Sequence, residues 1–331
     1  MGDRTEHSAS VPRVAIIGCG SIGSLLDEHS PGGVHTHAGG WTSSSRAKLS
    51  FLVERDEARL REAGRARGVD ALYDSAEALF AKEAVDIVSL CTPTEIRLPV
   101  IERALAAGVK TLLIEKPLAK TVAEAERIAA AIDAHGARAN VNYIRRWEPM
   151  LGELAARLSS GELGRVQHVS AVYGKGIVNN GTHLIDLLRW FFGEVSLSRV
   201  LRTRTGGSDP TVDVELSVGA GASAFPAYLL GTDSASYSVF EIDLVTTAGR
   251  IRILDGGHTL SEQLAREDPR FRGYRTLGPA TATTTKIDEA LRFTIEDTID
   301  LYLDAARAPR CSIHDALATL RIAEAIKDAS A

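Results

Sequence analysis

The sequence is poor in cysteine and has no long apolar run. Its 331 residues include three widely spaced cysteines, Cys19, Cys91 and Cys311. An odd, scattered set argues against a disulfide framework and a cysteine-based zinc site, and favours small buried thiols in a reducing cytoplasm. No apolar stretch approaches the roughly 20 residues that cross a bilayer, and no signal-peptide pattern is present. We therefore expect a cytoplasmic protein with no membrane partner.

An excess of positive charge is also missing. The formal net charge is -5, and no long basic run occurs. Nucleic acid is not expected as a partner, because phosphate binding requires a clustered positive patch. The chain is 44% apolar and 24% charged, like ordinary globular proteins, and its length corresponds to about two domains. The polar start, residues 1–12, is expected to be a flexible tail.

The first half of the chain alternates short apolar strands with amphipathic helices. The predicted strands lie at residues 13–17, 49–53, 85–90, 110–114 and 137–142. The predicted helices lie between them, at residues 57–67, 74–80, 99–107 and 122–135. Such alternation predicts an α/β fold whose parallel sheet is covered on both faces. We assign residues 13–142 to this domain and residues 143–331 to a second one.

A glycine motif follows the first predicted strand. Residues 18 to 23 read GCGSIG. Gly18 allows a tight turn, Gly20 lets the backbone approach a pyrophosphate, and Gly23 lets the helix pack closely on the strand. Ser21 and Ile22 open that helix, whose free N–H groups are expected to hold the phosphates. The motif predicts a bound dinucleotide.

The end of the second strand indicates which dinucleotide is bound. An acidic residue there holds the ribose diol of the adenosine, usually about 20 positions after the glycines. Glu54 is the candidate, displaced further along by an insertion around residues 27–37. Its carboxylate favours NAD and repels the 2′-phosphate of NADP, whereas Arg55 leaves NADP open. His35 and His37 lack a regular ligand spacing, so we expect a loop over the cofactor and no metal site.

The most informative motif is Glu115-Lys116-Pro117, directly after the strand at 110–114. Parallel sheets bind ligands beyond the carboxyl ends of their strands, so Lys116 is placed to face the dinucleotide. Glu115 is expected on the nicotinamide side, and Thr92 and Pro93 end the neighbouring strand beside the cofactor. Together with the glycine motif, this lysine predicts a nicotinamide-dependent oxidoreductase.

The second half contains a helix with a row of polar side chains. His183, Asp186 and Trp190 share one face of the helix predicted within residues 179–192, at spacings of three and four. An imidazole supported by a carboxylate suits acid–base catalysis. Two roles of Asp186 stay open: it orients His183, or it is a structural partner on the helix.

The remainder of the second half alternates polar and apolar residues. The strand predicted at 166–173 and the runs between residues 195 and 253 predict a mostly antiparallel sheet. We expect helices on one face of this sheet and an oligomer surface on the other. Residues 269–285 are interpreted as loop, and two C-terminal helices are predicted at 287–305 and 313–329.

Five signals in this order resemble the glucose-fructose oxidoreductase / inositol dehydrogenase / rhizopine catabolism (Gfo/Idh/MocA) family. They are GCGSIG, the pair Thr92-Pro93, EKP, the segment Tyr143–Arg146, and GTHLIDLLRW from residue 181. The resemblance extends from about Val14 to the C-terminus. It implies a Rossmann domain followed by an α/β domain with an open-faced sheet, through which subunits pair as homodimers or homotetramers.

The resemblance also implies the roles of site residues. Lys116 matches the family's catalytic lysine, which often precedes a cis proline, and His183 matches its catalytic histidine. The family's aspartate four residues before that histidine is Asn179 here, which can bind a substrate hydroxyl but carries neither charge nor proton at neutral pH. The further substrate-binding candidates are Arg145, Tyr173 and Lys175.

These features predict reversible hydride transfer between nicotinamide and a secondary alcohol or ketone of a sugar or nucleotide-sugar. Lys116 is expected to stabilise the alkoxide, and His183 to move the proton. An inositol-like cyclitol is the second substrate class, and the cations Arg145 and Lys175 leave a carboxylate or phosphate substrate open. Two other hypotheses remain. One is a non-catalytic protein that senses a dinucleotide or sugar, which Asn179 keeps open. The other is hydrolysis or elimination with recycled NAD.

Overall fold

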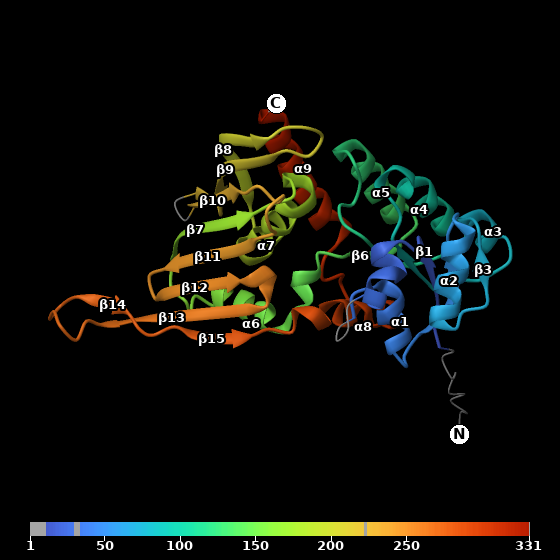
Figure 1. Cartoon of the computed structure of the whole chain (residues 1–331), viewed down its shortest axis with the longest axis horizontal. Helices are drawn as coiled ribbons and strands as arrows, with labels where there is room; N and C mark the ends of the chain where they lie inside the picture. The colour runs from blue at the N-terminus through green and yellow to red at the C-terminus, as the bar shows by residue number, and fades with distance from the viewer. Residues whose placement is uncertain (1–10, 30–33, 222–223, 331) are drawn as a thin grey trace, which may run out of the picture.

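The computed structural model describes residues 11–29, 34–221 and 224–330. Most of the predicted tail, and residues 30–33 of the predicted insertion, lie outside this range. Two sheets with their helices lie side by side (Figure 1). One has six strands and comes from the first half of the chain; the other has nine and comes from the second half.

The six-stranded sheet is parallel throughout, in the order β3-β2-β1-β4-β5-β6. Its strands are β1 (Arg13–Ile17), β2 (Lys48–Val53), β3 (Leu72–Tyr73), β4 (Ile87–Leu90), β5 (Thr111–Ile114) and β6 (Arg138–Val141). The helices between them are α1 (His37–Ser43), α2 (Glu57–Arg67), α3 (Ala76–Phe80), α4 (Arg97–Ala106) and α5 (Val122–Ala134). The predicted parallel sheet is confirmed. The sequence pattern misses β3, because two residues are too few to show a period.

The segment after the glycine motif differs from its prediction. Two short helical turns, Ser21–Leu25 and Leu26–His29, replace a continuous helix. Residue 37 lies in α1 and not in the loop expected over the cofactor. Thr36 caps α1 by accepting a hydrogen bond from the Gly39 backbone, and the Asp27 carboxylate accepts one from the His35 N–H at 2.7 Å. These local capping bonds order a Gly-rich stretch that has little helical propensity of its own.

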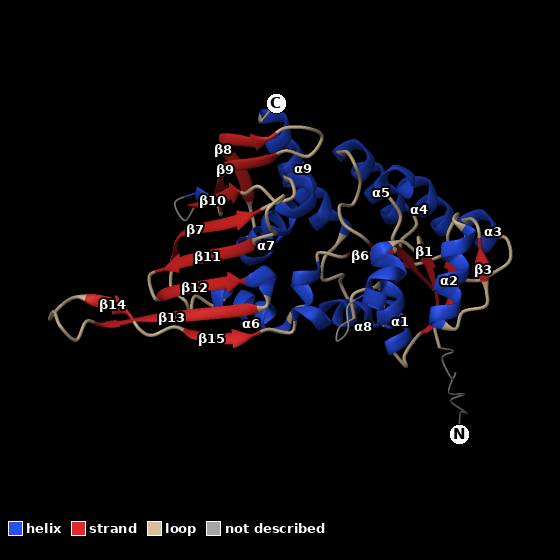
Figure 2. Ribbon diagram, viewed as in Figure 1, coloured by secondary structure: helices blue, strands red, loops and turns tan. Residues whose placement is uncertain are grey.

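The parallel sheet is covered on both faces (Figure 2). The helices α3, α4 and α5 pack on one face, joined by the start of α9 (Ile313–Ala329). On the other face, α1 and α2 are joined by α8 (Ala290–Leu303), whose Leu291, Ile295 and Ile299 are buried there. Helix α8 approaches α1 closely, since a Cβ on Gly40 would lie 2.1 Å from Ile295 Cδ1. The late segment 290–303 therefore completes the core of the first sheet.

The nine-stranded sheet is mostly antiparallel, as predicted, with one parallel pair between β7 and β10. Its main strands are β7 (Val166–Tyr173), β8 (Val195–Thr205), β9 (Thr211–Val218), β10 (Phe225–Gly231), β11 (Phe240–Thr246), β12 (Gly249–Leu254) and β13 (Thr259–Glu267). The helices α6 (Pro149–Ser159), α7 (Thr182–Phe192) and α9 bury their apolar side chains against one face of it. Along a strand, successive side chains point to opposite faces of the sheet. Buried and less buried residues therefore alternate, as they do in β11.

The loop predicted at 269–285 is wrong in part. Within it, β14 (Arg275–Leu277) and β15 (Thr281–Thr284) both pair antiparallel with β13. All four residues of β15 are exposed, so the segment shows no alternation of apolar and polar side chains. The strand exists because its backbone pairs with β13, and its side-chain pattern does not predict it.

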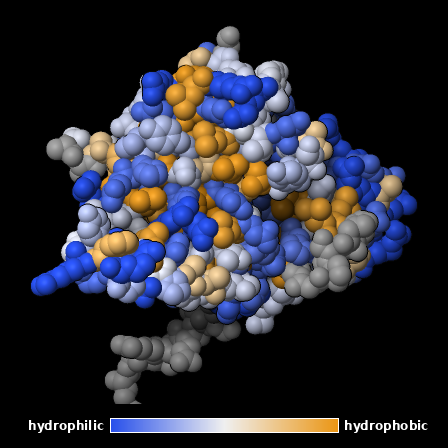
Figure 3. Space-filling model, turned by 60° about the vertical axis from the view of Figure 1, so that its left-hand side comes forward, coloured by the Kyte–Doolittle hydropathy of each residue, from blue (hydrophilic) through white to orange (hydrophobic). Residues whose placement is uncertain are grey.

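Within the part of the chain that the structure describes, no helix covers the other face of the large sheet (Figure 2). Figure 3 shows apolar side chains among polar ones across the molecule on this side. In β10, Ala227 and Leu229 face the helices, and Leu230, between Leu229 and Gly231, is exposed on the opposite face. Pairing through this face stays a prediction. Among the helices of the described ranges, none is both long and apolar enough to span a bilayer.

Candidate active site

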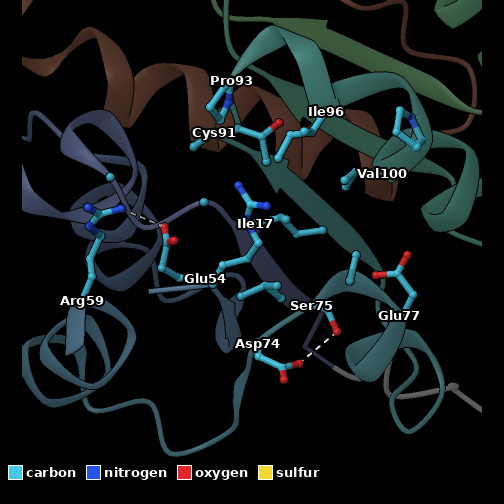
Figure 4. A pocket seen from close by; sticks show the side chains of 17 residues that line it. Ile17, Glu54, Arg59, Asp74, Ser75, Glu77, Cys91, Pro93, Ile96 and Val100 are labelled. Atoms are coloured by element: carbon cyan, nitrogen blue, oxygen red, sulfur yellow. Dashed lines mark hydrogen bonds and ion pairs between the residues drawn. The ribbon is translucent and has the colours of Figure 1, made fainter. Parts of the chain in front are cut away.

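A cleft of about 480 Å³ lies at the carboxyl ends of β1, β2 and β4 (Figure 4). Gly18 and Gly20 line it, and nothing lies within 4 Å of the Cβ that a larger residue would add at Gly20. Gly18 has a φ of +97°, which glycine adopts readily, and a Cβ there would lie 2.8 Å from the Cys91 carbonyl oxygen. A Cβ on Gly23 would lie 2.1 Å from the Gly18 carbonyl oxygen. The glycines thus leave open, at the mouth of the cleft, the space that a pyrophosphate needs, and the residues present fit a dinucleotide.

Glu54 extends from the end of β2 into the same cleft. Its Oε2 accepts a hydrogen bond from the Cys19 backbone at 3.1 Å, and its Oε1 accepts one from the Asp56 backbone at 3.1 Å. Arg59 Nη1 lies 3.5 Å from that carboxylate, and Arg55 lines the cleft beside it. The predicted ribose-binding carboxylate therefore lies against the glycine turn.

The cleft brings together predicted and unpredicted residues. Thr92 and Pro93 line it as expected. Sequence reasoning missed Arg59 and the segment 74–77 at the start of α3, which Figure 4 shows along one side of the cleft. The one signal in the sequence that marks Arg59 is its position in the first turn of α2, five residues after Glu54. The cysteines are free thiols, and burial raises the pKa of Cys19 to about 12, as expected for a buried packing residue.

A buried arginine holds the turn that carries Lys116. Arg97 is 2% exposed, and its guanidinium donates to the carbonyls of Thr92 at 2.7 Å, Glu115 at 2.6 Å and Leu118 at 3.3 Å. It also donates to the Pro117 carbonyl. The Lys116–Pro117 peptide is cis, as the resemblance implies. Sequence reasoning missed Arg97, since nothing nearby in the sequence links it to Lys116.

Glu115 belongs to a buried hydrogen-bond network behind Lys116. His37 Nε2 donates to Glu115 Oε1 at 2.8 Å, and His37 Nδ1 lies 2.6 Å from Ser89 Oγ. Asn142 Nδ2 donates to the same Oε1 at 2.6 Å. Burial raises the pKa of Glu115, but the bonds from His37 and Asn142 outweigh it, so the net pKa lies below its ordinary value. The carboxylate is therefore ionised at neutral pH.

Lys116 follows β5, and its Nζ reaches the turn Ile177–Gly181 that precedes α7. It donates to both the backbone oxygen and the Oδ1 of Asn179, each at 2.9 Å. Burial lowers the pKa of Lys116 and Arg145 lowers it further, while Glu115 and Asp209 oppose the shift. The structure thus brings together the lysine and the residue that replaces the family's aspartate.

His183 lies at the start of α7 with 8% of its surface exposed. Its ring meets Tyr143 edge-on at 5.5 Å and Phe240 at 6.4 Å between ring centres. Its Nδ1 is buried and has no hydrogen-bond partner among the described residues. Burial, followed by the charges of Lys116 and Arg145, holds the pKa of His183 well below its ordinary value. The imidazole is therefore neutral at neutral pH.

The structure separates the two roles left open for Asp186. Its two oxygens accept hydrogen bonds from Arg146 Nη2 at 2.8 Å and Nε at 2.9 Å. The structure gives Asp186 no hydrogen bond to His183, and the pair with Arg146 is almost fully buried. Of the two roles, the structural one has contacts behind it, and the assignment of Asp186 to catalysis is corrected.

Tyr173 also needs correction as a substrate contact. Its side chain is fully buried. Its hydroxyl donates to the Val212 carbonyl at 2.8 Å and accepts from the Val212 N–H at 3.0 Å. Burial raises the pKa of Tyr173. The hydroxyl therefore ties β7 to β9, and nothing in the sequence distinguishes that use from a site residue.

A second cleft of about 600 Å³ contains three of the predicted substrate residues, Arg145, Lys175 and Asn179, and Asn179 places it next to Lys116 Nζ. Lys116 and His183 are not among its lining residues. It is lined by Arg145, Lys175, Asn179, Asn180, Tyr237, Ser238, Val239, Phe240, Glu241, Asp255, Gly256 and His258. Arg145 lies over the Phe240 ring at 3.7 Å and donates to the Gly256 carbonyl. Burial lowers the pKa of Arg145 to about 10. Sequence reasoning missed the β11 and β12 ends of this cleft, because distant segments form it. No cluster of metal-ligating side chains occurs within the described ranges.

Comparisons with known proteins agree with this geometry. A family model, described as an oxidoreductase family with an NAD-binding Rossmann fold (GFO_IDH_MocA), matches residues 12–143. A D-apiose dehydrogenase of Paraburkholderia graminis is 28% identical over 255 residues, 67% of this chain and 65% of that protein. An inositol 2-dehydrogenase of Saccharopolyspora erythraea is 26% identical over 239 residues, 63% of this chain and 67% of the relative.

A solved structure shows that the same fold extends over the full chain. An oxidoreductase from Agrobacterium radiobacter, in complex with NAD+, L-tartaric acid and magnesium, matches with a TM-score of 0.73. The identity is 20%, and the match covers 97% of this chain and 96% of that one. The family model spans the parallel-sheet domain, residues 12–143, and the relatives continue beyond it, so the comparisons support the resemblance of this chain to the Gfo/Idh/MocA family of NAD-binding oxidoreductases.

Proposed function

We propose that the chain is an NAD(P)-dependent dehydrogenase or reductase acting on a secondary alcohol or ketone of a sugar or nucleotide-sugar. The observation that carries the proposal is the position of Lys116 Nζ, 2.9 Å from two oxygens of Asn179 at the edge of the second cleft. A bound nicotinamide supplies the hydride acceptor or donor, chemistry that no side chain offers. Everything else in the reaction is positioning and proton handling by the chain.

Lys116 acts on the substrate oxygen. Negative charge develops there during alcohol oxidation, and a fixed ammonium beside it stabilises that charge. The buried Arg97 fixes the backbone of the turn, and Asn179 fixes the side-chain amine. An oxygen of the substrate replaces part of the Asn179 contact when it binds.

His183 moves the proton. Alcohol oxidation needs a base that is unprotonated at working pH, and burial together with two nearby cations keeps this imidazole neutral. In the reverse direction the same ring returns the proton to the alkoxide. Asp186 supports α7 through Arg146 and takes no part in the transfer.

NAD is the preferred cofactor in this proposal. The Glu54 carboxylate lies where the adenosine ribose binds and is held by the glycine turn itself. A 2′-phosphate there meets like charge, which disfavours NADP. Arg55 and Arg59 line the same cleft, and their positive charges can pair with a 2′-phosphate, so NADP is the alternative cofactor.

The second cleft suits a polyhydroxyl substrate. Its lining mixes amides, carboxylates and cations, which give donors and acceptors in several directions. Relatives named for apiose and for inositol support a sugar first and a cyclitol second. We further propose that the protein works in the cytoplasm as a homodimer or homotetramer paired through the open sheet face.

Nicotinamide absorbance tests the proposal directly. Purified protein is offered NAD or NADP with a panel of sugars, cyclitols and nucleotide-sugars, and NADH or NADPH with the matching ketones. Turnover with one class, reduced roughly 100- to 1,000-fold in Lys116→Met with cofactor binding intact, supports it. Cofactor binding without turnover on any class favours a sensing protein, and product formation without net NADH favours hydrolysis or elimination.

A further inference from the structure

Asp209 lies next to the segment that faces Lys116, although it comes from the connection between β8 and β9. Its Oδ1 accepts a hydrogen bond from the Val178 N–H at 2.7 Å, and its Oδ2 accepts one from the Asn179 N–H at 2.9 Å. These bonds hold the short turn Ile177–Gly181 that leads into α7. The carboxylate therefore fixes the residue whose two oxygens bind Lys116 Nζ.

Glycine at position 176 makes room for this carboxylate. A Cβ there would lie 2.2 Å from Asp209 Oδ2 and 2.3 Å from its Cγ. Gly176 also has a φ of +83°, a conformation that other residues rarely adopt. The neighbouring backbone is held separately, because the Ile177 N–H donates to the Pro210 carbonyl at 2.9 Å. The close approach of Asp209 is thus built into the turn.

The charge of Asp209 acts on Lys116. Within the described residues, the ion pairs of this hairpin use Asp213 and Glu215 and do not include Asp209. Its field raises the pKa of Lys116 against the effect of burial. Position 179, where the family resemblance leads us to expect a carboxylate, holds a neutral amide.

We propose that Asp209 is a positioning residue that supplies, from the β8–β9 connection, the negative charge missing at Asn179, and so holds Lys116 charged and directed at the substrate oxygen. The proposal rests on the proposed function. It explains how a neutral residue at position 179 is compatible with a catalytic lysine. Asp209 itself touches neither substrate nor cofactor and acts through Asn179.

The titration of Lys116 tests this. Trace acetic anhydride labels neutral amines, and mass spectrometry of the Lys116 peptide across pH gives its apparent pKa, with exposed Lys82 as internal reference. In Asp209→Asn we expect that pKa to fall by roughly 0.5–1 unit. The double variant Asn179→Asp/Asp209→Asn returns a carboxylate to position 179 and restores the value. The other charged or titratable groups facing Lys116 are Glu115, Arg97, Arg145 and His183, and all variants keep them.

Asp213→Asn is the matched control. It removes a carboxylate from the adjacent strand, where Asp213 binds Arg204 and the Gly231 backbone and does not contact the turn at 177–181. We expect Lys116 to titrate as in the wild type. If Asp209→Asn fails to fold, the smaller uncharged Asp209→Ser gives the same lowering of the pKa.

An unchanged Lys116 pKa in the Asp209 variants overturns the proposal. A lowered pKa that the double variant does not restore also overturns it, because the effect then comes from distortion of the turn and not from the missing charge. The labelling needs neither cofactor nor substrate, so its result stands whether or not a dehydrogenase activity is found. Where that activity is found, Asp209→Asn lowers kcat and leaves cofactor affinity unchanged.

Discussion

Glu115 Oε1 lies 2.8 Å from His37 Nε2, although 78 positions separate the two residues in the chain. The contact joins the start of α1 to the turn that carries Lys116. Asn142 reaches the same oxygen from the end of β6. Three separate segments therefore set the orientation of the peptide that precedes the lysine.

Replacing His37 should weaken both stability and turnover. His37→Phe removes one of two donors to a buried carboxylate oxygen, and a hydrogen bond to a charged group contributes about 1.5–3 kcal/mol. Urea unfolding measures the loss, and kcat should fall because the Lys116 turn loses one support. Ser89→Ala removes only the bond at Nδ1 and should cost about 1 kcal/mol. Unchanged unfolding and kcat in His37→Phe would show that the network does not support the turn.

His183 should make the stability depend on pH in a defined direction. Its pKa in the folded state is below its ordinary value, so the unfolded chain binds the proton more readily. Its contribution to the free energy of unfolding is complete above about pH 6.5 and is lost as pH falls toward the folded-state pKa. Chemical unfolding of wild type and His183→Gln between pH 5 and 8 measures this. The difference between the two proteins should shrink toward acid pH, and a constant difference would contradict the assignment.

The activity profile follows from the same pair of side chains. A neutral His183 predicts that kcat/KM for oxidation stays level down to pH values below about 6.5. Because the pKa of Lys116 is lowered from its ordinary value, the alkaline decline should begin below about pH 10.5. Lys116→Arg keeps a charge at all accessible pH and should remove that alkaline decline, at a much reduced rate. An alkaline decline retained in Lys116→Arg would assign it to another group.

Asp186 should behave as a structural residue. Asp186→Asn takes from the buried guanidinium of Arg146 its bidentate partner and leaves it the Asp315 carboxylate, 3.6 Å away. Breaking one partner of a buried pair costs about 3–5 kcal/mol. Thermal or urea unfolding measures the loss. The double replacement Asp186→Leu/Arg146→Met should recover much of the lost free energy of unfolding. The folded double variant should retain most of the turnover. A stable double variant that has lost turnover by orders of magnitude would return Asp186 to the chemistry.

Glu54 should set the cofactor preference. Glu54→Ser removes the carboxylate that binds the ribose diol, and loss of such charged hydrogen bonds weakens NAD binding about tenfold or more. The ratio of NADP to NAD affinity should rise, because the repulsion of a 2′-phosphate disappears. Fluorescence titration with both cofactors gives the ratio. Glu57→Gln, at an exposed position in the first turn of α2, is the control, and an unchanged ratio in Glu54→Ser would exclude the ribose role.

Local sequence patterns predict much of the fold and part of the site. The glycine turn, Glu54, the EKP turn and His183 each follow from a strand end or helix face that periodicity alone locates. The roles of Arg97 and Asp209 cannot be predicted in this way. Arg97 binds Glu115, 18 positions away, and Asp209 binds Asn179, 30 positions away, and no local sequence pattern reports such distant contacts. The same limit applies to α8 and β15, whose placement depends on packing and pairing with distant segments.

Asp186 and Tyr173 show the opposite limit. Both residue types suit a catalytic site, and both lie beside residues of the predicted site in the sequence. The structure uses each one to join two buried elements, through Arg146 and through the Val212 backbone. Residue chemistry and spacing are the same for the two uses, so only the contacts distinguish them.

Helix α8 has a consequence for the order in which the protein is made. A ribosome that has released residues 13–142 has delivered all six strands of the parallel sheet, but only part of the covering for each of its faces. The apolar surface that Leu291, Ile295 and Ile299 later bury must wait for about 150 further residues of synthesis. The nascent first half therefore exposes apolar surface, and we expect chaperones to bind it. A fragment ending at residue 142 should aggregate when expressed alone, whereas the same fragment co-expressed with residues 143–331 should be rescued.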